Sequence, residues 1–240
     1  MDSKDSEEIE IAPRANLPGT KAANFFKFRK EADHIPFTEI PGSFGLQEFI
    51  LGNIERDPTD CEGIISLPSS LPKEKWINVW ILEHTRIFAW QLGDLTLSLD
   101  GKCIPESCPV MAVPSPSSPA SKPLQFLCAA HKRPHDCCAI DYALHALDGT
   151  SSLLHNSSYF PSRTEVSGQS FKFFKNLARR LLRVFAHAFH VHHDEFIEFE
   201  KRTHLGLRFV LYCAKYSLAE TDLIPTEELK RIRDESRSKK

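Results

Sequence analysis

The sequence contains no apolar run of about 18 residues, the minimum length that a membrane-spanning helix needs. Its N-terminal segment, MDSKDSEEIEIAPRANLPGTK, is too polar and acidic for a signal peptide. It also has no excess of either charge: 30 Lys and Arg residues face 32 Asp and Glu residues, for a formal net charge of −2. We therefore expect a cytoplasmic protein that binds no nucleic acid and has no transmembrane segment. Any contact with internal membranes is expected to be peripheral and to run through partner proteins.

Disulfide bonds are not expected either. The chain has seven cysteines, an odd number, and no secretory signal, so the thiols should stay reduced. With 240 residues, of which 41% are hydrophobic, the chain is long enough to bury a large core. A metal is therefore not needed merely for folding.

The pattern along the chain predicts one mainly α-helical domain over residues 23–230. Residues 1–22 and 231–240 are polar and are expected to be flexible. Residues 113–123 (VPSPSSPASKP) contain four prolines and four serines, which predicts a surface loop. Helical spacing is clearest in residues 73–92, 139–154, 170–202 and 226–233, whereas residues 93–99 (GDLTLSL) suggest a short strand.

Five cations lie on the polar side of the long helix predicted for residues 170–202. At about 100° per residue, Lys175, Arg179 and Arg183 fall within about 60° of Lys172, and Arg180 lies about 80° from it. No acidic residue occurs between Val166 and Val191. Such a stripe can bind an anion, and a guanidinium suits phosphate, although a solvated polar face has the same spacing and duplex nucleic acid is a third alternative. The five are Lys172, Lys175, Arg179, Arg180 and Arg183.

The same helix contains VFAHAFHVHH (residues 184–193), with four histidines in the last seven residues of this stretch. His192 falls in the apolar arc and His187 at its border, whereas His190 lines up with the cations and should be solvated. A buried imidazole needs a hydrogen-bond partner or a metal. On one continuous helix His187 and His192 lie about 140° apart, and the pair His187 and His190 would converge better.

Two cysteines in GKCIPESCPVM have a spacing that suits a metal. A short loop separates Cys103 from Cys108, so both thiolates can reach one tetrahedral ion, and zinc prefers sulfur and nitrogen ligands. Cys128, Cys137 and Cys138 are alternative ligands that spacing does not exclude. From the residues alone, the ligand set stays open.

The motifs together resemble those of the Mob family of kinase- and phosphatase-associated adaptors, and most strongly its phocein branch. Cys103-x4-Cys108 is followed far downstream by Arg180-x2-Arg183-x3-His187-x4-His192. The phocein-like segments are PGTKAANFF (residues 18–26), EHTR (83–86), FLCAAHK (126–132), AIDYALHALDG (139–149) and YFPSR (159–163).

This resemblance implies a four-helix bundle with one structural zinc per chain, bound by Cys103, Cys108, His187 and His192. It also implies a phosphopeptide- or anion-binding patch at Arg179, Arg180 and Arg183. The function expected from it is a non-catalytic adaptor of a striatin-type scaffold, with a type 2A protein phosphatase and germinal-centre-type kinases. The alternative is a coactivator of NDR-type kinases. A metalloenzyme is not expected, because the sequence has no HExxH motif and a full set of four ligands leaves no position for substrate.

Overall fold

The computed structural model describes residues 44–115 and 122–238. The segment expected to be flexible at residues 1–22 lies outside these ranges, and so do residues 116–121 of the proline-rich segment. The elements in chain order are α2 (Gly45–Arg56), α3 (Cys61–Ile64), α4 (Lys73–Ser98), β1 (Ala112–Val113), β2 (Leu124–Gln125), α5 (Ala139–Leu154), the 3-10 helix η3 (Gly168–Ser170), α6 (Phe171–Val191), α7 (His193–Thr203), α8 (Leu205–Lys215) and α9 (Thr226–Arg237).

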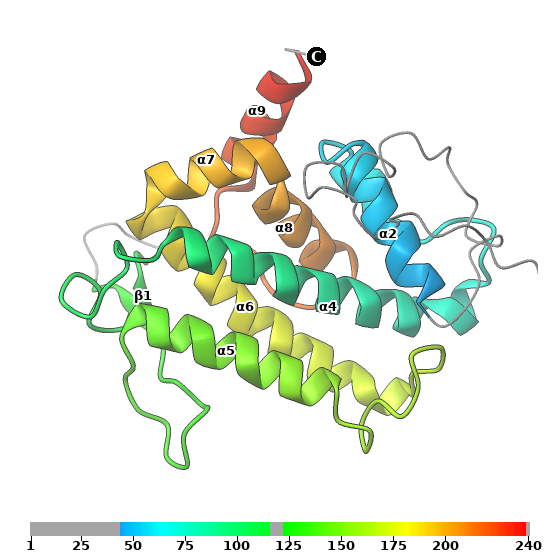
Figure 1. Cartoon of the computed structure of the whole chain (residues 1–240), viewed down its shortest axis with the longest axis horizontal. Coiled ribbons are helices and arrows are strands. Elements are labelled where there is room, and N and C mark those ends of the chain that lie inside the picture. Colours follow the sequence, from blue (N-terminus) through cyan, green and yellow to red (C-terminus); the bar gives the residue numbers. More distant parts are fainter. Residues whose placement is uncertain (1–43, 116–121, 239–240) are drawn as a thin grey trace, which may run out of the picture.

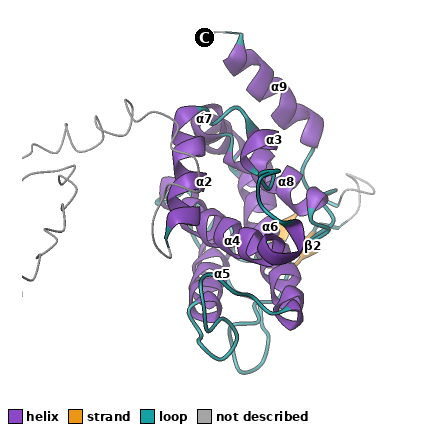
Figure 2. Cartoon of the chain, turned by 90° about the vertical axis from the view of Figure 1, so that its right-hand side faces the viewer, coloured by secondary structure: helices purple, strands orange, loops and turns teal. Residues whose placement is uncertain are grey.

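The expected mainly helical fold is confirmed. Helices α4, α5 and α6 run side by side, and α8 packs against α4 and α6 to complete a four-helix core (Figure 1). Aromatic side chains fill its centre, where Phe88 of α4 meets Phe209 and Tyr212 of α8. In Figure 2, turned by 90°, α9 projects from the core on the side opposite to α5. In the described ranges, no helix has the length and apolarity needed to cross a membrane.

Helix α4 extends beyond its predicted end. Residues 93–98, for which we suggested a strand, continue α4 to Ser98. Their alternating pattern was misleading, because Leu92, Leu95 and Leu99 are buried at helical spacing while Leu97 is exposed. Helix α5, in contrast, has the bounds predicted for it and continues through Gly149 to Leu154.

The long helix predicted for residues 170–202 is two helices. Helix α6 ends at Val191 and α7 begins at His193, with His192 between them in a non-helical conformation (φ −123°, ψ 51°). Asp194 and Glu195 lie in the first turn of α7, where negative charge is favoured by the helix dipole. That acidic pair ends the long stretch without acids that follows Glu165, and it is the sequence signal for the second helix.

Residues 231–237, which belong to the segment expected to be flexible, are helical. Helix α9 continues to Arg237, and the side chains of Ile232 and Arg233 are buried. The Arg233 guanidinium donates from one nitrogen to both carboxylate oxygens of Glu62, at 2.8 and 3.0 Å. The polar composition of this segment conceals the one face of α9 that packs.

Candidate metal centre

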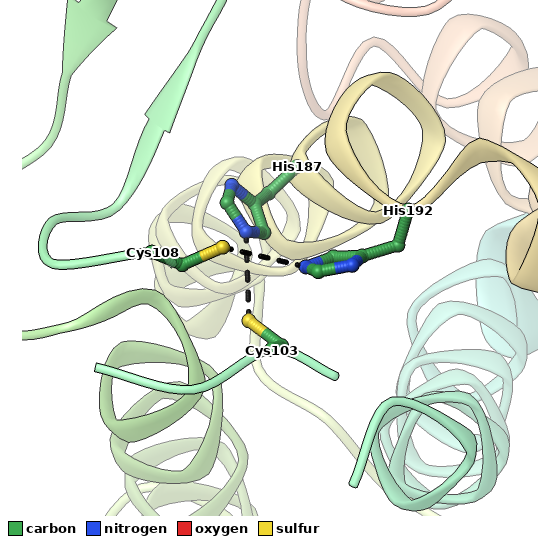
Figure 3. A group of neighbouring side chains, drawn as sticks. All are labelled: Cys103, Cys108, His187 and His192. Atoms are coloured by element: carbon green, nitrogen blue, oxygen red, sulfur yellow. Dashed lines mark hydrogen bonds between the residues drawn. The ribbon is translucent and has the colours of Figure 1, made fainter. Parts of the chain in front are cut away.

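The four side chains predicted as metal ligands lie together in the structure. Cys103 and Cys108 occupy the loop after α4, His187 lies near the C-terminal end of α6, and His192 is the residue between α6 and α7. All four are buried, and their ligand atoms lie within 4.8 Å of one another. Figure 3 shows the four side chains pointing into one common space.

The distances suit a tetrahedral ion. The Cys103 Sγ atom lies 3.6 Å from His187 Nε2, and the Cys108 Sγ atom lies 3.5 Å from His192 Nε2. A tetrahedral zinc with bonds of about 2.3 Å to sulfur and about 2.0 Å to nitrogen separates those two ligand atoms by about 3.5 Å. The group can therefore hold a metal ion without rearrangement.

The bend at His192 removes the geometric objection raised by a continuous helix. Because the backbone leaves the helical path at that residue, the His192 ring turns back toward His187, and their ring centroids lie 5.4 Å apart. His190, which spacing favoured as the partner of His187, instead bonds through Nε2 to the carbonyl oxygen of Leu223 at 2.8 Å. It is partly buried, so the expectation that it is solvated was wrong.

A hydrogen bond orients the His187 imidazole for coordination. The His187 Nδ1 atom lies 2.8 Å from the carbonyl oxygen of Ala112, to which it can donate a proton, and this leaves Nε2 free as a ligand. Burial lowers the pKa values of His187 and His192, which favours neutral rings. Burial also raises the pKa of the Cys103 thiol to about 12, so a cation that binds here must displace protons.

A group of two cysteines and two histidines can bind a cation but leaves no open position. Catalytic zinc sites use three protein ligands and keep a fourth position for water or substrate. When all four side chains coordinate, no such position remains. The chemistry that this group supports is structural.

The predicted anion-binding arginines do not all face the same space. Arg179 and Arg183 line a hollow of about 580 Å³, together with Lys175. Arg180 is partly buried and is not among the residues that line the hollow. The helical wheel already placed Arg180 furthest from the other cations, and the structure separates it from them.

The hollow also has an apolar wall and two acidic residues. Leu124 and Phe126 line one side, and Glu220 and Asp222 come from the segment after α8. The Arg183 guanidinium stacks on the Phe126 ring at 4.5 Å, and its Nη1 atom donates to the Tyr142 hydroxyl at 3.0 Å. Arg183 is thus held in position from two sides.

In the part of the chain that the structure describes, no carboxylate lies within 4.0 Å of the guanidinium of Arg179, Arg180 or Arg183. A guanidinium without a carboxylate at this distance can accept an external anion. Glu220 and Asp222 would compete with that anion for the same positive charge.

The structure also brings together a second set of possible ligands that the sequence analysis did not assemble. These are Cys128, His131, Cys137 and His145. From the sequence, Cys128 and Cys137 were predicted only as alternative ligands for the first site. The spacing Cys-x2-His, followed closely by Cys-x7-His, was the available signal.

Comparison with known proteins agrees with these features. The profile of the Mob1/phocein family matches residues 59–226, more than half of the chain. A protein of Caenorhabditis elegans described as MOB-like protein phocein is 39% identical over 209 residues, which is 87% of either chain. MOB kinase activator-like 4 of Drosophila melanogaster is 37% identical over 205 residues, 85% of either chain. MOB kinase activator-like 1A of Medicago sativa subsp. falcata is 28% identical over 72% of this chain and 81% of its own.

The buried group of two cysteines and two histidines therefore sits in a helical chain that resembles this one family over most of its length. The chain belongs to the Mob1/phocein family.

Proposed function

We propose that this protein is a non-catalytic adaptor whose helical domain is stabilised by one zinc ion at Cys103, Cys108, His187 and His192. The buried position of the four ligand atoms and their spacing support this assignment. Zinc is the metal that two sulfur and two nitrogen ligands in tetrahedral geometry favour. The absence of an open ligand position supports a structural role for the ion.

The adaptor's binding activity is assigned to the hollow beside α6, and this hollow is the observation that carries the proposal. Lys175, Arg179 and Arg183 present positive charge next to the apolar wall of Phe126. Such a combination suits a phosphothreonine peptide, because the guanidinium groups bind the phosphate and the wall packs against the peptide. Arg180 would add positive electrostatic potential around the phosphate but would not contact it directly.

The complex that the adaptor serves is proposed to be a striatin-type assembly with a type 2A protein phosphatase and germinal-centre-type kinases. The similarity to the phocein of Caenorhabditis elegans supports this proposal. The alternative is that the protein binds and activates NDR-type kinases. The relatives described as MOB kinase activator-like favour that alternative: one of them, of Drosophila melanogaster, is 37% identical, and two others are 26% and 28% identical.

Binding of a phosphothreonine peptide tests the hollow. We expect Arg183→Ala and Arg179→Ala each to weaken binding by about tenfold to a hundredfold, because each removes a charge-assisted hydrogen bond of about 1.5–3 kcal/mol. Arg180→Ala should have a smaller effect. Arg231→Ala, on the exposed side of α9, is the matched control and should leave the affinity unchanged.

The acidic residues of the hollow give a test in the opposite direction. Glu220→Gln combined with Asp222→Asn should strengthen phosphopeptide binding, since both carboxylates repel the phosphate. Titration calorimetry with the phosphorylated and unphosphorylated peptide measures both changes. Equal affinity for the two peptides would contradict the assignment.

Affinity purification from cells with mass spectrometry distinguishes the two assemblies. Striatin-type scaffold and phosphatase peptides should dominate over NDR-type kinase peptides. The reverse abundance would replace the first proposal by its alternative.

A further inference from the structure

We propose that the chain has a second zinc site, formed by Cys128, His131, Cys137 and His145. Three of these residues lie in the loop between β2 and α5, and His145 lies in the second turn of α5. Their ligand atoms lie within 4.8 Å of one another, the same limit that the first group meets. None of them belongs to the first group, so the two sites would bind separate ions.

The individual distances suit coordination. The Cys128 Sγ atom lies 3.6 Å from His145 Nδ1, and the Cys137 Sγ atom lies 3.8 Å from the same nitrogen. Both values are close to the separation of about 3.5 Å expected between sulfur and nitrogen on a tetrahedral zinc. The His131 Nε2 atom approaches Cys137 Sγ more closely, at 3.0 Å.

A cation accounts for this arrangement more fully than hydrogen bonding does. The Cys137 sulfur has imidazole nitrogens of His131 and His145 beside it, and a thiol is only a weak donor and a weak acceptor. A cation at the centre would satisfy both rings and both sulfurs at once. Cys128 and Cys137 are also buried, with 3% and 8% of their surfaces exposed, so their sulfur atoms face this group and not solvent.

A neighbouring histidine, His135, lies at the edge of the group, with its Nδ1 atom 3.9 Å from the Cys137 sulfur. The His135 Nδ1 atom lies 2.8 Å from the carbonyl oxygen of Asp136, and its ring stacks on the His131 ring at a centroid distance of 3.9 Å. His135 therefore helps to orient His131 toward Cys137. Its own donor capacity is used by the backbone.

The loop that supplies three of the ligands has little regular secondary structure. Between Gln125 and Ala139 it has no helix or paired strand apart from one bridge, Cys128 to His135. Segments that cannot build a hydrophobic core of their own are commonly held by a metal or by disulfides. A zinc ion would tie this loop to α5 through His145.

Metal content of the purified full-length chain, grown with zinc, provides the first test. We expect two zinc ions per chain in the wild type and one in Cys137→Ser. Cys138→Ser is the matched control: it alters the adjacent thiol, which is not in the group, and should retain two ions. One ion in the wild type that Cys137→Ser retains, or two ions in Cys137→Ser, would overturn the proposal.

The same count separates this site from the first one. Cys103→Ser should also fall from two ions to one. A wild type with one ion that Cys103→Ser loses and Cys137→Ser keeps leaves the first site standing and removes the second. The converse pattern removes the first site and leaves the second.

Thiol labelling of the wild type avoids dependence on a variant that fails to fold. After alkylation and peptide mapping, Cys128 and Cys137 should be protected in the zinc-loaded chain and labelled once a chelator is added. Cys213, fully buried in α8, reports on general unfolding and should stay protected. Equal labelling of Cys128 and Cys137 with and without chelator, or a disulfide between them, would contradict the second site. If Cys213 is labelled as well, the chain has unfolded, and the metal count alone then decides whether the second site exists.

Discussion

Glu200 and Gly206 show how closely single residues fit where α7 meets α8. The buried Glu200 carboxylate accepts the backbone N–H groups of Gly206 at 2.7 Å and Leu207 at 2.9 Å, which lie in the first turn of α8. A Cβ atom added at Gly206 would lie 2.7 Å from the ring of Phe196 and 3.0 Å from Glu200. The glycine is required by this close approach.

We therefore expect Gly206→Ala to lower the free energy of unfolding by about 1–3 kcal/mol, the usual cost of overpacking. Gly149→Ala is the control, because Gly149 lies inside α5 and an added Cβ meets nothing within 4 Å. That substitution should stabilise the protein by about 0.5–1 kcal/mol through helix propensity. Urea unfolding measures both, and a Gly206→Ala variant as stable as the wild type would contradict the packing argument.

Glu200 also predicts a pH dependence of stability. Burial raises its pKa from 4.5 to about 7, against the opposing effect of the two backbone N–H groups. Between these values the folded state holds a proton that the unfolded state has lost. The free energy of unfolding attributable to this group therefore falls as the pH rises from about 4.5 to 7, by roughly 3 kcal/mol in all.

The measurement compares unfolding of the wild type with that of Glu200→Gln between about pH 5 and pH 8, which spans the shifted titration. The neutral amide has no such titration, so the stability of the wild type relative to the variant should decrease as the pH rises. Metal ligands titrate equally in both proteins and cancel in the difference. Parallel stability profiles would show that Glu200 does not titrate in this range.

At the scale of the elements, spacing predicted most helices but not where they end. The apolar periodicity of α4, α5 and α6 was sufficient to identify them, since buried positions repeat every three or four residues. It could not reveal the bend at His192, because the apolar pattern continues into α7. Backbone direction at such a junction depends on tertiary packing, which periodicity does not record.

Helix α9 illustrates the reverse case: it was predicted for residues 226–233, but polar composition concealed its extension to Arg237. We expect Ile232→Ala to destabilise the protein by about 2–3 kcal/mol, because a nearly buried side chain would leave a cavity. Arg231→Ala changes the neighbouring exposed residue and should have an effect within about 0.5 kcal/mol. Thermal unfolding of the two variants checks this, and equal midpoints would mean that α9 does not contribute to the cooperative unit.

At the scale of the whole molecule, the metal groups adjoin a core that is large by itself. Most side chains of the central cluster come from helices, among them α4, α5, α6 and α8, and the four cysteines of the two groups are also members. We therefore expect a chelator to lower the melting temperature without abolishing helical structure, unlike in a small zinc finger, which unfolds without metal.

Circular dichroism with added chelator makes that measurement, and restoration of the midpoint by zinc is the control for damage. Complete loss of helical signal at room temperature would show that the core cannot fold alone. An unchanged midpoint would argue against any structural metal.

The candidate site was predictable in its ligands but not in its geometry. The residues Cys103, Cys108, His187 and His192 came from a family resemblance, whereas the wheel alone favoured His190 over His192 as the partner of His187. The separation of Arg180 from Arg183 was visible on the wheel. The Phe126 wall was not, because it comes from a loop that lies far before Arg183 in the chain, with the whole of α5 between them.

The interruption between α6 and α7 has one more implication, for protein engineering. Substitutions that raise helix propensity are a common route to thermostability, and residues 191–194 are an obvious target for them. Here a continuous helix would move one imidazole away from its two sulfur neighbours. Optimising that junction would thus weaken the protein it was meant to strengthen.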